Sequence, residues 1–91
     1  MGVVILKMSS GEEVICGCDV PNAGKYVVEK PRMIQVMQDE SGNMRAGLAP
    51  WIVSAPDATV TIESGVVACV PAPTDIEKAY LSQTSRIQLL G

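Results

Sequence analysis

Histidine and phenylalanine are both absent from this 91-residue chain, and tryptophan and tyrosine together supply only three residues. Without histidine the chain lacks the commonest general base and metal ligand of proteins. No Ser-His-Asp, Cys-His, phosphate-loop or dinucleotide-binding pattern occurs. The acidic neighbours Glu12 and Glu13, like Asp39 and Glu40, fall in expected turns, where adjacent side chains point apart and stay solvated. We therefore predict no enzymatic activity, no catalytic residue and no cofactor.

Long apolar runs and an excess of basic residues are also missing. The longest apolar runs are a few residues, too short to span a membrane, and the first residues lack the pattern of a secretory signal. The net charge of −3 disfavours broad electrostatic binding of nucleic acid. The odd number of cysteines, three, cannot pair completely within one chain, which favours reduced thiols and a cytoplasmic location.

The residues that are present favour a small β-rich domain that contacts other subunits. Apolar residues make up 47% of the chain and charged residues 19%. A chain of this length buries only about 60–65% of its unfolded surface. It therefore has more apolar surface than a small monomer hides easily. The many valine and isoleucine residues favour strands, because β-branched side chains pack well on a pleated surface.

The clearest local pattern is a β-hairpin in the first 19 residues. Val4, Leu6 and Met8 alternate with other residues, and Val14, Cys16 and Cys18 repeat this period of two after a Ser-Ser-Gly turn. Side chains two apart lie on one face of a strand, and glycine in the turn tolerates a positive φ. The pattern predicts two antiparallel strands that share one apolar face.

The rest of the chain continues with short strand-like segments and ends in a helix. A proline- and glycine-containing turn is expected at residues 21–24 and a polar hairpin loop at 38–43, and Pro31 is expected to bend the third strand. Thr74 and Glu77 form a capping-box pattern, and Ile76, Ala79, Tyr80 and Gln83 share one helical face. Residues 87–90 form an apolar tail. The predicted strands cover residues 3–9, 12–20, 25–37, 44–53, 59–62 and 66–70, and the helix covers 75–84.

The order and spacing of these elements resemble the Sm/LSm family, with the closest likeness to Sm-like proteins of phages and bacteria. The residues that resemble the first Sm motif are Val4, Leu6, Met8, Gly11 and Val14. Residues 62–70, with a glycine turn before an apolar strand, resemble the second motif. The resemblance implies a five-stranded, strongly bent antiparallel barrel over residues 3–71, followed by the short helix. It also implies a homo-oligomeric ring, located in the host cytoplasm if the gene is a phage gene.

The residues that bind RNA in this family are not matched here. Cys16 stands where the family has the glycine that bends the second strand, with Gly17 one position later. The base-stacking aromatic position falls on Gly24 and the base-binding asparagine position on Tyr26. Glu63 or Ser64 replaces the arginine of the second motif. The uridine pocket of the family is therefore absent from the sequence, whereas the predicted fold does not depend on it.

Two sets of residues are candidates for binding. Lys25, Lys30 and Arg32 form the only basic concentration, and they could contact phosphates; the alternative is an ordinary solvated strand face. Tyr26 could stack on a base, or it is a half-buried aromatic residue with its hydroxyl in water. Trp51 is a candidate interface anchor or a residue buried within the subunit. The candidate ring interface is an apolar strand without a protecting charge, formed by Val66, Val67, Ala68, Cys69 and Val70.

Cys16 and Cys18 are the only pair that suggests metal or redox chemistry, because both thiols lie on one strand face. A closed zinc site needs four ligands, and Cys69 is the only further cysteine. Core packing is therefore the favoured interpretation, and no metal site is predicted. Two functions remain: an Sm-like ring subunit associated with RNA, or a homo-oligomeric scaffold that does not bind nucleic acid. Salt-dependent retention of oligo-U separates them.

Overall fold

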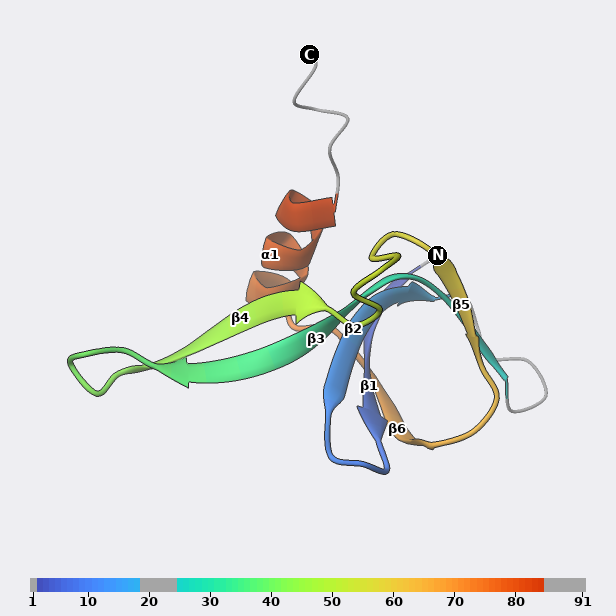
Figure 1. Cartoon of the computed structure of the whole chain (residues 1–91), viewed down its shortest axis with the longest axis horizontal. Coiled ribbons are helices and arrows are strands. Elements are labelled where there is room, and N and C mark those ends of the chain that lie inside the picture. The colour runs from blue at the N-terminus through green and yellow to red at the C-terminus, as the bar shows by residue number, and fades with distance from the viewer. Residues whose placement is uncertain (1, 19–24, 85–91) are drawn as a thin grey trace, which may run out of the picture.

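A computed structural model describes residues 2–18 and 25–84 of the chain. These residues form one antiparallel sheet of six strands and a helix near the C-terminus (Figure 1). The elements are β1 (Gly2–Met8), β2 (Glu13–Cys18), β3 (Tyr26–Gln38), β4 (Met44–Pro50), β5 (Thr59–Ile62), β6 (Val66–Pro71) and α1 (Thr74–Thr84). The helix is far too short and too polar to cross a membrane, and it is the only helix in the described ranges.

The strand order is β4-β3-β2-β1-β6, and β5 pairs with β3 outside this path. The long strand β3 has two partners on one edge, because residues 26–29 pair with β5 and residues 32–38 pair with β4. The two halves meet at a register shift opposite β2, where Lys30 has a φ of 51°. An extra residue in one strand bends it and increases its twist. This bend curls β5 away from β4 and leaves the β3–β4 hairpin projecting as an arm (Figure 1).

The first core fills the concave side of the curled sheet. Leu6, Val14, Cys16 and Val28 are completely buried there, and Met8, Cys18 and Ile62 complete the cluster. Half-buried side chains pack around this cluster: Val4, Tyr26, Trp51, Val60 and Val66.

The second core lies on the opposite side, where α1 covers the sheet. Ile5, Ile15 and Tyr80 are its buried members, with Ile34 and Leu48 packed beside them. The Tyr80 hydroxyl accepts a hydrogen bond from the Gly17 N–H (3.1 Å) and donates one to the Glu29 carbonyl (2.9 Å). The helix is thus anchored to β2 and β3 by both apolar and polar contacts.

The predicted class, a mainly antiparallel β protein with a short C-terminal helix, is confirmed. The apolar face of the first hairpin and the extent of β5 are also as predicted. The expected number of five strands is wrong, because the described residues form six and β5 and β6 form no ladder with each other. The strand expected at 44–53 ends at Pro50 and turns at residues 51–54, and Ala79 is exposed rather than packed. The turn at 21–24 and the tail at 87–90 lie outside the described residues.

Candidate self-association edges

Strand β6 lies at one end of the sheet path, and its side chains are exposed on both faces. Val67 and Val70 are 64% and 49% exposed, and Ala68 and Cys69 are also exposed. Only Val66 packs against the first core. Apolar side chains therefore line an edge strand that contains no charged residue, which is the arrangement that natural proteins usually avoid on a free edge.

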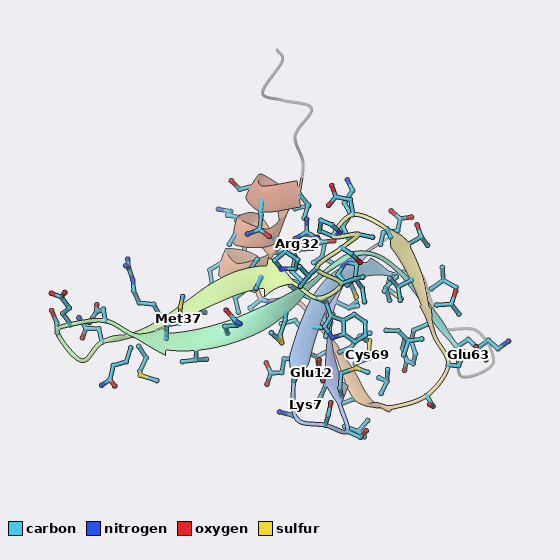
Figure 2. All side chains as sticks on the ribbon, in the orientation of Figure 1. Lys7, Glu12, Arg32, Met37, Glu63 and Cys69 are labelled. Atoms are coloured by element: carbon cyan, nitrogen blue, oxygen red, sulfur yellow. The ribbon has the colours of Figure 1, made fainter. Side chains whose placement is uncertain are left out.

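The backbone of β6 has hydrogen-bonding groups to offer on its outer side. The Ala72 N–H donates to the Val3 carbonyl, and the register pairs Val70 with Ile5 and Cys69 with Leu6. Because bonded and non-bonded pairs alternate along an antiparallel ladder, Val70 bonds to β1 and Cys69 directs its N–H and C=O outward. Figure 2 shows Cys69 on the concave side of the curl.

Strand β5 presents a second short edge. Its residues pair with β3 from Thr59 opposite Glu29 to Ile62 opposite Tyr26, and the Lys30 N–H donates to the Ala58 carbonyl. The same alternation directs the backbone groups of Thr59 and Thr61 away from β3. No other described strand pairs with this side of β5.

The four residues predicted to bind nucleic acid do not form one surface. Lys25 is exposed, Tyr26 is half-buried against the first core, and Lys30 is half-buried at the bend of β3. The Lys30 ammonium lies 3.4 Å from the Thr84 carbonyl at the end of α1. Arg32 is only 6% exposed, so its guanidinium is directed into the protein.

Arg32 connects three parts of the chain that lie far apart in sequence. Its guanidinium donates to the Gln83 side chain on α1 (2.8 Å), to the Pro56 carbonyl (2.5 Å) and to Asp57 Oδ1 (2.7 Å). The arginine thereby holds the 51–58 segment and the helix against β3 (Figure 2). Nothing in the local sequence reveals this role, because Asp57 and Gln83 are 25 and 51 positions away.

Trp51, a candidate interface anchor, is half-buried against the first core. Its indole N–H donates to Glu12 Oε2 (2.6 Å), and the Ser10 hydroxyl donates to the other oxygen of the same carboxylate. The bonds from Ser10 and Trp51 lower the pKa of Glu12 below its ordinary value. This contact joins the turn of the first hairpin to the segment after β4.

Cys16 and Cys18 pack in the first core, as the favoured interpretation predicts. Burial, followed by the nearby Cys18 and Cys69 thiols, raises the pKa of Cys16 to about 12. A thiol with such a pKa remains protonated near neutral pH and is a poor nucleophile and metal ligand. Within the described ranges, no three histidine, cysteine, aspartate or glutamate side chains are grouped to hold a metal ion.

Comparison of the chain with models of protein families and with curated proteins gives no match. The resemblance to Sm-like proteins therefore depends on the sequence pattern described above.

Proposed function

We propose that this protein is a non-enzymatic scaffold subunit that assembles with copies of itself through strand edges into an Sm-like ring. In this assembly β6 of one copy pairs with β5 of the next, and the curled sheet is completed as a barrel-like unit at each junction. The observation that carries the proposal is the exposed, uncharged β6 edge.

The physical argument concerns the state of β6 in an isolated molecule. Its outward N–H and C=O groups would be hydrated, and its apolar side chains would remain in contact with water. Pairing with another strand replaces the hydration of these backbone groups with ladder hydrogen bonds and removes part of the apolar surface from water. A β6–β5 contact joins two different surfaces of the same molecule, and repetition of such a contact forms a ring where the rotation closes.

RNA association is not included in this proposal. The net charge is −3, and Arg32 is engaged by the protein itself. Lys25, Tyr26 and Lys30 thus provide a weaker phosphate-binding surface than the sequence suggested. Salt-dependent retention of oligo-U on a filter, lost in the double variant K25A and K30A, would add an RNA-binding role to the scaffold.

The test is sedimentation of the full chain and of two proline variants. Cys69→Pro and Thr61→Pro each remove an outward N–H without removing a hydrogen bond to the neighbouring strand of the same molecule. Both variants should lose the ring mass, because the two edges are partners. The matched controls Cys69→Ser and Thr61→Ser keep the N–H groups and should assemble normally.

Two results would contradict the proposal. The wild-type protein could sediment as a 9.6 kDa monomer across a concentration series. Alternatively, both proline variants could keep the wild-type mass while their circular dichroism remains that of the folded protein.

A further inference from the structure

The arm formed by β4 and residues 32–38 of β3 exposes apolar side chains on both faces, although Gln35 and Arg45 share one of them. Val36 and Met44 are 63% and 66% exposed on the face that continues into the second core, and Met37 is 53% exposed on the other. The arm projects beyond the body of the protein, and no other described element covers its outer half (Figure 1). A lone two-stranded hairpin has only marginal stability in water, so this exposed apolar surface needs a partner.

The free edge of β4 has its backbone groups arranged for a further strand. The Trp51 N–H bonds to the Pro31 carbonyl and the Asp39 N–H to the Asn43 carbonyl. The register between these two pairs is regular, so the bonded positions of β4 are the odd-numbered ones. Met44, Ala46 and Leu48 therefore direct their N–H and C=O groups away from β3.

We propose that this edge pairs with the same edge of a second copy, antiparallel and centred on Ala46. In this register Ala46 faces Ala46 of the partner subunit, and Met44 faces the partner's Leu48. The outward groups of Met44, Ala46 and Leu48 then bond to one another across the twofold axis. The two arms become one four-stranded sheet, which has enough strands for independent stability.

Side-chain chemistry favours a second copy of the chain as the partner of this edge, in this register. Arg45 is the only charged residue of β4, and in this register it faces the partner's Gly47, an uncharged residue over which the Met37 methyl of the same molecule lies. A shift of the axis to Arg45 would place two guanidinium groups opposite each other, which is destabilising. Met44 reaches the partner's Leu48, which lies at the border of the second core, so the apolar face of one arm continues into the core of the other molecule.

Combined with the proposed ring, on which this part of the inference rests, the arm contact has a consequence for symmetry. A contact between different edges forms a ring, and a contact between identical edges is twofold. Together they produce a dihedral assembly of two rings joined by their arms. The two contacts use separate strands, so each can be removed alone.

The first experiment measures mass by sedimentation velocity for Ala46→Pro, with Ala46→Ser as its control. Proline at position 46 removes an outward N–H and leaves the β3–β4 ladder intact. The expected result is a particle of half the wild-type mass, with the full mass retained by the serine variant. In a Cys69→Pro background the arm contact should remain and produce a dimer, which Ala46→Pro converts to a monomer.

The second experiment tests the twofold axis with charge. Ala46→Lys and Ala46→Glu each place like charges opposite each other at the axis, so each variant alone should lose the arm contact. An equimolar mixture of the two should recover it, because lysine then faces glutamate. This recovery does not depend on the tolerance of the strand for proline.

The proposal is overturned if Ala46→Pro, Ala46→Lys and Ala46→Glu all keep the wild-type mass. It is also overturned if the mixture fails to recover the contact that each charged variant has lost. Loss of the arm contact on truncation after Thr84 would assign the contact to the C-terminal residues instead. Failure of the ring alone leaves a dimer that still depends on Ala46, so the two proposals can fail separately.

Discussion

Individual polar side chains join segments of this small protein that lie far apart in the sequence. Arg32, predicted to lie on a binding face, is instead a buried cross-link between β3, α1 and the 51–58 segment. Trp51 and Glu12 form a second cross-link at the other end of that segment. Both cross-links are polar contacts at the margin of an apolar core, where an unpaired group is costly.

Replacement of Arg32 by alanine should destabilise the fold by about 2 kcal/mol, because it removes the hydrogen bonds that join β3 to α1 and to the 51–58 segment. Urea unfolding followed by the fluorescence of Trp51 measures this change. Lys25→Ala is the matched control, since Lys25 is exposed, and it should leave the unfolding midpoint unchanged. Equal stability of the Arg32→Ala variant and the wild type would contradict the role assigned to Arg32.

The Trp51–Glu12 contact should depend on pH. The folded protein lowers the pKa of Glu12 below its ordinary value of 4.5, mainly through the Ser10 bond and then through Trp51. Because the folded pKa is below the unfolded one, the stabilisation is complete above pH 4.5 and is lost as the pH falls through the lower folded value. Trp51 fluorescence should therefore change in acid before global unfolding, and Glu12→Gln should remove this change. A transition that persists in the glutamine variant belongs to another group.

At the level of the elements, the bend of β3 organises the sheet. Lys30 occupies the left-handed region of backbone conformation with a φ of 51°. This conformation is unfavourable for residues other than glycine or asparagine. The bend separates the edge that pairs with β5 from the edge that pairs with β4. It thereby determines both the curl of the body and the direction of the arm.

The backbone strain at Lys30 predicts unequal effects for two substitutions. Lys30→Val should destabilise the protein by about 1–2 kcal/mol more than Lys30→Gly, because a β-branched residue is least tolerant of positive φ. Both variants remove the same ammonium, so the loss of its contact with the Thr84 carbonyl cancels in their difference. Thermal unfolding of the pair provides the comparison, and indistinguishable midpoints would exclude strain at this position.

The Tyr80 hydroxyl is the buried polar attachment of helix α1 to β2 and β3. Tyr80→Phe keeps the ring in the second core but leaves the Gly17 N–H and the Glu29 carbonyl without a partner. The expected loss is about 1–3 kcal/mol in the free energy of unfolding. Hydrogen exchange of the Gly17 amide should quicken in this variant more than exchange of the buried β1 amides. Unchanged protection at Gly17 would show that the hydroxyl contributes nothing there.

For the whole molecule, the unusual feature is the amount of apolar surface left at strand edges. Val67 and Val70 on β6, and Val36, Met37 and Met44 on the arm, are exposed in the isolated chain. The proposed contacts place a copy of the same chain beside each of these two regions. Stability and assembly should therefore be linked, because a contact that exists only between folded copies stabilises the folded state.

The melting temperature should accordingly rise with protein concentration. The double variant Cys69→Pro with Ala46→Pro lacks both contacts, so its melting temperature should be lower and independent of concentration. Scanning calorimetry over a dilution series measures both quantities. A wild-type melting temperature that does not depend on concentration would contradict assembly as a source of stability.

The strands and the helix were predictable because their signals are local. The period of two in Val4, Leu6 and Met8 identifies a buried strand face within five residues, and a capping pattern with apolar spacing identifies the helix. Six separate strand segments were predicted, whereas the number five came from the family resemblance. The end of the strand expected at 44–53 was less predictable, because only the ladder with β3 shows that it stops at Pro50.

The positions of the charged groups and the free edges depended on tertiary structure. Arg32 is polar in sequence and buried in the fold, because its partners come from α1 and from the segment before β5. Likewise, residues 66–70 were predicted to be an interface strand, but only the sheet order shows which side of β6 is unpaired and that β4 also has an unpaired side among the described strands. Pattern over a few residues specifies which side of a strand is apolar, whereas long-range pairing specifies which strand lies at an edge.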